Sequence, residues 1–429
     1  MNDKKQSNME SKGKNIPKLR FPGFEGEWEV KKLGEISSVF QGYGFPEKYQ
    51  GKTNGDIPFY KVSDISFSTD KGNKYILDAK NYIDKETLPL LHAKLIPIGS
   101  TIFAKIGEAI RKNNRAITKV PCLIDNNAAA IKAIENISLD EFLFYTMSQI
   151  ELINYAGGVV PAVTKTAIES IQVPFPTLPE QQKIASCLSS LDGQISAEQS
   201  RLESLSQHKR GLMQQLFPQE GETVPKLRFP GFEGEWEVEK IHDLFEIRNG
   251  YTPSKATPEY WENGTIPWFR MEDIRENGNI LYDSMQHISK SAIKGNKLFK
   301  ANSIIVATSA TIGEHALIKV DSMANQRFTN LAIKENYAQL LDTMYIYHYM
   351  FIVDEICKKN TNMNAFASVD MKTFGNIPFS FPALPEQQKI ASCLTAIDKL
   401  IAAQQERIEA LKQHKRGLMQ QLFPAVANE

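Results

Sequence analysis

The clearest pattern of apolar and polar positions occurs twice in the chain. Residues 178–218 and 384–424 are two copies of one segment, identical at 30 of 41 positions at an offset of 206 residues. In each copy the apolar residues alternate at spacings of four and three, a 3.5-residue period that predicts the seam of a coiled coil. The predicted seam residues are Ile184, Leu188, Leu191, Ile195, Leu202, Leu205, Leu212 and Leu216, then Ile390, Leu394, Ile397, Ile401, Ile408, Leu411, Leu418 and Leu422. The polar seam positions are Glu198, Lys209, Gln404 and Lys415.

The ends of both helices carry recognisable signals. A proline that needs no hydrogen-bonded N–H and then a glutamate open each copy, and a proline closes it. These signals predict helices over 179–217 and 385–423, each about 58 Å long at about 1.5 Å per residue.

A second repeat divides the rest of the chain. The segments 17–30 and 225–238 are identical, and each opens about 160 residues that end at a long helix. Short β-rich runs such as 100–104 and helical patterns such as 139–155 predict an α+β fold for each of these domains. The predicted order is a flexible tail (1–16), a first domain (17–178), a spacer helix (179–217), a linker (218–224), a second domain (225–384), a second helix (385–423) and a tail (424–429).

The short linker predicts that the two helices pair antiparallel. Its seven residues reach only about 25 Å, whereas a parallel pair requires the second domain to bridge about 58 Å. Pairing positions whose numbers sum to 606 sets Ile184 against Leu422. The same register sets Glu198 against Ile408 and Lys209 against Ile397, with the lysine ammonium in water. The predicted fold is therefore two tandem α+β domains, separated by two long helices that form an intramolecular antiparallel coiled coil.

The two domains have diverged far more than the segments around them. Only short echoes remain, such as residues 55–65 against 264–274. A molecule that keeps its scaffold and varies two equivalent modules is predicted to recognise two different things. Two modules at a fixed separation suit a bipartite site on a periodic polymer such as DNA.

Composition excludes several classes of protein. The chain has 50 basic and 50 acidic side chains, so any nucleic-acid contact must come from local patches. The four cysteines lack the spacing of a zinc site and are typical of reduced thiols in the cytoplasm. The N-terminus lacks the apolar region of a secretory signal, and the apolar runs are too short to span a bilayer. We therefore expect a cytoplasmic protein without a metal or membrane segment.

Local runs supply the candidate DNA contacts. Residues 101–120 are rich in Lys and Arg, and 290–300 hold four lysines without an acid. Lys and Arg attract phosphate, and Arg and Asn pair with base edges, although such runs can equally be solvated surface. Tyrosines beside glycines could stack on bases or could mark structural turns. The candidates are Tyr43, Lys61, Lys105, Arg111, Lys112, Asn113, Asn114 and Arg115 in the first domain, and Tyr251, Arg270, Lys290, Lys294, Lys297, Thr308, Ser309, Thr311 and Arg327 in the second.

Signatures of catalysis are missing from the sequence. Residues 40–44 mimic the F-x-G-x-G of an AdoMet-binding loop, but the chain contains no Pro-Pro and hence no N-P-P-Y/F motif. It also contains no G-x-x-x-x-G-K-[S/T] phosphate-binding loop. We predict a protein that recognises its target, with no catalytic, cofactor or metal site of its own.

The motifs together resemble a known family, the DNA specificity subunit of Type I restriction-modification systems. The resemblance rests on the paired L-P-E-Q-Q-K-I-A segments (178–185 and 384–391), W-E-V-x-K-[L/I] at Trp28 and Trp236, the G-x-I-P-[F/W] turns and the I-G-E loops. It implies two target-recognition domains, each reading half of a split double-stranded DNA sequence, with the helices setting the spacing.

The resemblance also implies partners. Two modification (methyltransferase) subunits are expected on the helices and the entry segments 17–30 and 225–238, and two ATP-dependent restriction subunits can join them. AdoMet, ATP and Mg²⁺ would belong to those partners. Two alternatives remain: a self-contained DNA-modifying enzyme, and a coiled-coil scaffold without DNA contact.

Overall fold

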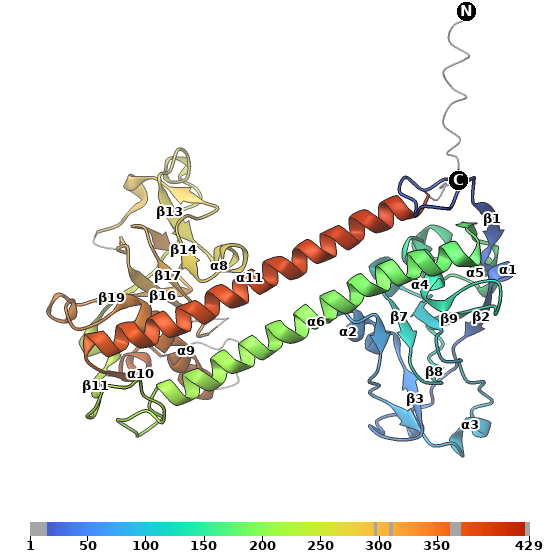
Figure 1. Ribbon diagram of the computed structural model, residues 1–429. Helices are drawn as coiled ribbons and strands as arrows, with labels where there is room; N and C mark the ends of the chain where they lie inside the picture. The colour runs from blue at the N-terminus through green and yellow to red at the C-terminus, as the bar shows by residue number, and fades with distance from the viewer. Residues whose placement is uncertain (1–14, 296–297, 309–311, 361–369, 425–429) are drawn as a thin grey trace, which may run out of the picture. The chain divides into compact units, whose positions relative to one another are not determined.

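The computed structural model describes residues 15–295, 298–308, 312–360 and 370–424, and it divides into two compact units (Figure 1). Unit 1 combines residues 1–202 with 404–429, and unit 2 comprises residues 203–403. These limits cut across the boundaries predicted from the sequence, because each domain packs on a part of both long helices.

Unit 1 is an α+β structure in which short helices and 3₁₀ turns lie between the strands along the chain. Its strands are β1 (Glu29–Lys32), β2 (Ser37–Gln41), β3 (Ile57–Tyr60), β4 (Tyr75–Ile76), β5 (Tyr82–Ile83), β6 (Thr101–Ala104), β7 (Arg115–Thr118), β8 (Leu123–Ile124), β9 (Ala128–Ala133) and β10 (Gln172–Phe175). Its helices are α1 (Leu33–Ile36), α2 (Val62–Asp70), α3 (Thr87–Leu90), α4 (Asp140–Ser148) and α5 (Lys165–Ser170), with 3₁₀ turns η1 (Glu47–Tyr49), η2 (Glu108–Lys112) and η3 (Leu152–Tyr155).

Unit 2 repeats this plan. Its strands are β11 (Glu237–Lys240), β12 (Phe245–Asn249), β13 (Ile266–Phe269), β14 (Ile280–Leu281), β15 (His287–Ile288), β16 (Ser303–Ala307), β17 (His315–Ile318), β18 (Met323–Ala324), β19 (Phe328–Ile333) and β20 (Pro378–Phe381). Its helices are α7 (Ile241–Leu244), α8 (Met271–Asn277), α9 (Thr343–Asn360) and α10 (Met371–Gly375), with 3₁₀ turns η4 (Pro258–Tyr260), η5 (Lys290–Ala292) and η6 (Glu335–Tyr337).

The sheet topology is the same in the two units. The five-stranded sheets have the orders β2-β9-β6-β7-β4 and β12-β19-β16-β17-β14. In each, the last pair is parallel and the others are antiparallel. Three-stranded sheets β5-β3-β8 and β15-β13-β18 and the pairs β1-β10 and β11-β20 complete the plan. The predicted α+β fold and its duplication are confirmed.

The central strands are buried on both faces, as their continuous apolar runs predict. In β6, Phe103 lies in the core that faces the long helices, and Ile102 lies in a second core on the opposite face. In β16, Ile304 and Ile305 divide in the same way. Each five-stranded sheet therefore forms the middle layer of its unit.

The two long helices, α6 (Leu178–Leu216) and α11 (Leu384–Leu422), begin and end one residue earlier than predicted (Figure 1). All sixteen predicted seam residues are buried or half-buried. In unit 1, Ile184 at the start of α6 shares a core with Leu422 at the end of α11. In unit 2, Leu216 at the end of α6 shares a core with Ile390 at the start of α11. The helices therefore pack antiparallel within each unit.

The predicted partners of the polar seam residues are wrong. Gln404 donates to the Glu198 carbonyl at 3.0 Å and to its carboxylate at 2.6 Å, and Lys209 pairs with Asp398 at 2.6 Å. The Lys209 ammonium is largely buried, so it pairs with a carboxylate instead of reaching water, because an unpaired buried charge is costly. The repeat places Asp192 at the position of Asp398 and Lys415 at the position of Lys209. These two residues form the same ion pair, at 2.5 Å.

Candidate nucleic-acid interface and partner-docking surface

The basic run of unit 1 surrounds the turn η2, between β6 and β7. Arg111 is 58% exposed and its Nε donates to Glu108 at 3.0 Å, and Lys112 beside it is also exposed. An exposed ion pair of this kind is weak, so both cations are available to phosphate. Together with Lys119, which follows β7 and is also exposed, these two residues are the accessible cations of the run.

Arg115 belongs to the interior, which corrects the prediction that it contacts DNA. Its side chain is 5% exposed, its guanidinium lies 5.2 Å from the Phe103 ring centre, and burial lowers its pKa to about 9. It donates to the Asn113 side chain at 2.5 Å, to the Asn114 carbonyl at 3.1 Å and to the Ile150 carbonyl at 3.3 Å. Because β7 is buried on both faces, Arg115 and Asn113 hold the end of η2 in place.

The remaining candidates of unit 1 are half-buried and anchored. The Lys105 ammonium donates to Gln41, and burial lowers the pKa of Lys105. The Lys61 ammonium donates to Gln50 at 2.6 Å. The Tyr43 hydroxyl accepts from the Lys94 backbone N–H at 3.0 Å, which ties down a turn. These contacts stabilise loops, and the Tyr43 hydrogen bond agrees with a structural role for this tyrosine, while its stacking on bases stays a prediction.

Unit 2 shows the same division between anchored and exposed candidates. Tyr251 donates to the Ala292 carbonyl and accepts from the Lys294 N–H at 2.9 Å. Arg270 is the N-cap residue of α8, and its backbone N–H donates to the Asp273 carboxylate at 2.7 Å. The Thr308 hydroxyl lies 3.2 Å from the Thr329 hydroxyl. Among the described candidates of both units, the exposed side chains are Arg111, Lys112, Lys290, Lys294 and Arg327. Lys297, Ser309 and Thr311 lie outside the described residues.

A second surface lies at the entry segments 17–30 and 225–238, where the family resemblance leads us to expect the modification subunits. In unit 1, Arg20 forms a two-pronged ion pair with the buried Glu180 at 2.8 and 2.9 Å. In unit 2, Arg228 pairs with the buried Glu386 at 2.8 and 2.7 Å, and this contact raises the pKa of Arg228. Each entry segment is thereby fixed to the first turn of a long helix.

The entry segments also contact the end of the other long helix. The Leu19 N–H donates to the Gln421 carbonyl in unit 1, and the Leu227 N–H donates to the Gln215 carbonyl in unit 2, both at 2.9 Å. Gln421 and Gln215 are equivalent residues of the two copies. One identical segment therefore joins a helix start to a helix end in each unit.

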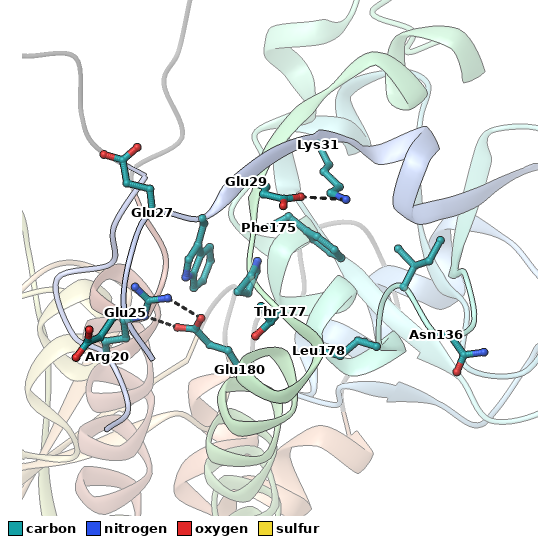
Figure 2. Close-up of a pocket in the computed structure, with 13 residues that line it drawn as sticks. Arg20, Glu25, Glu27, Glu29, Lys31, Asn136, Phe175, Thr177, Leu178 and Glu180 are labelled. Carbon is teal, nitrogen blue, oxygen red and sulfur yellow. Dashed lines mark hydrogen bonds and ion pairs between the residues drawn. The ribbon is translucent and has the colours of Figure 1, made fainter. Parts of the chain in front are cut away.

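The unit 1 entry segment lines one part of an open cavity of about 380 Å³ (Figure 2). Figure 2 shows Arg20 reaching Glu180 at one side and Glu29 paired with Lys31 at another. The wall is completed by Glu25, Glu27, Trp28, Asn136, Ile137, Phe175, Pro176, Thr177 and Leu178. The exact repetition of residues 17–30 was the sequence signal for this segment, whereas the Arg20–Glu180 ion pair and the cavity were not predicted.

Comparison with known proteins places these features in a family. The Type I restriction modification DNA specificity domain matches residues 25–207 and, a second time, residues 233–413. The specificity subunit of the Type I restriction enzyme EcoprrI from Escherichia coli is 56% identical over 159 residues, which cover 37% of this chain and 39% of that protein. The putative Type I restriction enzyme MjaX specificity subunit from Methanocaldococcus jannaschii is 22% identical over 426 residues, covering 96% of each protein.

A solved structure agrees at the level of the fold. The S subunit of a Type I restriction-modification system from M. genitalium superposes with a TM-score of 0.55 at 13% sequence identity, covering 95% of this chain and 99% of that one. The five-stranded sheet of each unit and most of both long helices lie within the matched family regions. The chain therefore belongs to the family of Type I restriction-modification DNA specificity subunits, and it carries the specificity domain twice.

Proposed function

We propose that this chain binds double-stranded DNA at a bipartite target, and that unit 1 and unit 2 each read one half. The observation that carries the proposal is the contrast between two regions of one duplicated structure. The sheet order, the entry segments and the long helices repeat closely, while the sequences of the domains between them have diverged. A common scaffold with two different surfaces suits two different half-sites.

The exposed cations supply the phosphate contacts in this proposal. Arg111 and Lys112 in unit 1 and Lys290, Lys294 and Arg327 in unit 2 stand at the surface without deep burial. Phosphate contacts position a protein on the duplex, and other side chains then read the base edges. The chain carries no net charge, so these few local cations and the partner subunits share the phosphate contacts.

The long helices set the distance between the half-sites. Both have 39 residues, and their seam contains ion pairs that fix one register, Asp192 with Lys415 and Lys209 with Asp398. A helix of this length spans about 58 Å, and a paired helix resists bending better than a single one. A fixed spacer predicts a fixed number of unread base pairs between the half-sites.

The entry segments receive the partners. In each copy nine of the fourteen residues are exposed, the pattern of burial repeats residue by residue, and Leu19 and Leu227 are both 41% exposed. Exposed positions usually vary at little cost to stability. Their identity supports two copies of one partner, each docked at one entry segment.

We assign those partners as two modification (methyltransferase) subunits, which two ATP-dependent restriction subunits can join. The chain itself then has no catalytic role, and AdoMet, ATP and Mg²⁺ belong to the partners. AdoMet binding by the isolated chain would instead favour a self-contained modifying enzyme.

The test uses host DNA and the complex assembled with the modification subunit. Sequencing of methylated adenines is expected to reveal one split motif with a constant gap, and the motif disappears when the gene for this chain is deleted. The complex is expected to bind a duplex with that motif more tightly than a scrambled duplex, with affinity falling as salt rises. Equal binding to both duplexes would favour a scaffold without specific DNA contact.

A further inference from the structure

A tight turn in unit 1 presents two valines to solvent. The turn comprises residues 157–162 and is closed by two backbone hydrogen bonds, from Gly157 N–H to the Ala162 carbonyl at 3.0 Å and back at 3.1 Å. At its tip Val159 is 104% exposed and Val160 is 63% exposed. We call residues 157–162 the valine turn. The two hydrogen bonds close the turn, and both side chains at its tip lie in solvent.

The valine turn is fixed beside the exposed cations of η2. The Gly107 N–H donates to the Pro161 carbonyl at 2.8 Å, and the Val163 N–H donates to the Lys105 carbonyl at 2.9 Å. Val163 is buried and anchors the base of the turn. Because η2 begins at Glu108, one residue after Gly107, the apolar tip and the exposed side chains Arg111 and Lys112 lie on neighbouring segments.

The backbone around the turn is open to close approach. A Cβ built on Gly107 or on Gly157 has no atom of the described residues within 4 Å. Gly107 also has a φ of 78°, which side chains other than glycine adopt rarely. Glycines of this kind let another molecule approach the main chain closely. A molecule that meets the turn can therefore approach its main chain closely at these two glycines.

The positive charge of η2 and the divergence of the valine turn from its counterpart in the second copy indicate that this molecule is DNA. Arg111 and Lys112 match the phosphate backbone, and valine methyl groups match the apolar edge that a thymine methyl presents in the major groove. Residues 157–163 read GGVVPAV, whereas 363–369, at the equivalent positions of the second copy, read MNAFASV and lie outside the described residues. Two different half-sites of a split target require two different reading surfaces, so they suit segments of different sequence. Two copies of one protein partner would instead require the same surface in both units.

We propose that Val159 and Val160 contact the bases of the half-site read by unit 1, and that Arg111 and Lys112 hold the adjacent phosphates. This inference rests on the proposed function and adds the residues that carry specificity. The valine turn thus acts as a base-reading element, and η2 acts as its phosphate anchor.

The experiment compares variants of the full chain in complex with its modification subunit. Val159→Thr combined with Val160→Thr keeps the β-branched shape of the tip and replaces one methyl group of each valine by a hydroxyl. Arg111→Gln combined with Lys112→Gln removes the two charges. Val120→Thr makes the same chemical change at another exposed valine of unit 1 and serves as the matched control. Affinity is measured for the host motif, for duplexes altered in one half or the other, and for a duplex altered in both.

We expect the valine variant to lose discrimination at one half-site by about tenfold, the size of a typical single base-pair contact. Its discrimination at the other half-site and its affinity for the doubly altered duplex stay unchanged. The charge variant loses affinity for every duplex, and the slope of log affinity against log salt falls by about 2. The Val120→Thr control behaves like the parent chain.

The outcomes separate this inference from the proposed function. If the parent complex does not discriminate between duplexes, the proposed function itself fails. If the parent discriminates and the valine variant keeps full discrimination, or loses it equally at both halves, the valine turn is not a reading element. An unchanged salt slope in the charge variant overturns the phosphate role of η2. Intact discrimination at the second half-site shows that the variant is folded, and Val159→Ala alone repeats the test with a smaller change.

Discussion

At the residue scale, neighbouring cations in one run have opposite roles. Arg111 stands in solvent, while Arg115, four residues later, is enclosed and donates to three acceptors. The sequence shows the charges of the run. It does not show that β7 is buried on both faces, because that burial depends on the layers packed on either side of the sheet. Prediction from the sequence therefore assigned too many residues of this run to the surface, and the DNA contact of its exposed residues stays a prediction.

This division predicts different consequences for two alanine substitutions. Arg115→Ala removes a buried donor and leaves its acceptors unsatisfied, so we expect a loss of roughly 2 kcal/mol in the free energy of unfolding. Arg111→Ala is expected to leave stability unchanged within about 0.5 kcal/mol and to weaken DNA binding. Urea unfolding and equilibrium binding measure the two effects. Equal destabilisation by both substitutions would contradict the assignment.

A buried histidine of unit 2 predicts a dependence of stability on pH. His348 accepts from or donates to the Thr395 hydroxyl at 3.0 Å, and its pKa is lowered to about 3, chiefly by burial and next by the Lys209 charge. The other titratable groups near His348 are Asp398, whose Oδ2 lies 3.9 Å from His348 Nδ1, and His315, which also lowers the pKa of His348. An unfolded histidine has a pKa of about 6.5, so the unfolded chain gains a proton first as the pH falls. The stability that the neutral ring supplies is complete above about pH 6.5 and is lost toward pH 3.

The variant His348→Tyr tests this dependence. Tyr145 occupies the corresponding place in unit 1, where its hydroxyl donates to Asp192 at 2.5 Å, so a tyrosine is compatible with this position in the repeat. We expect the variant to flatten the fall in unfolding free energy between pH 6.5 and 4, because one titrating group is gone. His414→Tyr, at an exposed histidine of α11, serves as the control. An unchanged pH profile would show that His348 is not responsible.

At the element scale, the long helices were the most predictable part of the molecule. The 3.5-residue period and the terminal prolines located each helix to within one residue. The partners of Glu198 and Lys209 were mispredicted, because the apolar seam alone was considered and Asp398 beside it was not. Periodicity therefore gives the packing face reliably, while the polar contacts depend on residues at the edge of that face.

The helices predict a length effect on the target. Inserting seven residues after Ala197 in α6 and seven after Ala403 in α11, at equivalent positions, preserves the 3.5-residue seam. Each insertion lengthens its helix by about 10 Å, which corresponds to about three base pairs at about 3.4 Å each. We expect adenine-methylation sequencing to show the same two half-sites with a longer gap. Ala197→Ser with Ala403→Ser is the control of unchanged length. A changed base in either half would contradict the spacer role.

At the scale of the whole molecule, duplication explains how one chain treats two surfaces differently. The entry segments, which are identical, are held by Arg20 with Glu180 and by Arg228 with Glu386, and they suit one partner used twice. The domains have diverged in sequence while keeping one sheet order. Among the described residues no helix is long and apolar enough to cross a membrane.

The most direct test of this account exchanges the first domain. Residues 31–177 are replaced by the corresponding segment of a related chain with a different target, while both entry segments and both long helices stay intact. Methylated adenines are then sequenced in cells that produce the exchanged chain with the original modification subunit. We predict a motif in which one half changes and the other half and the gap stay the same. A change in both halves, or a motif without a gap, would contradict recognition by two independent units.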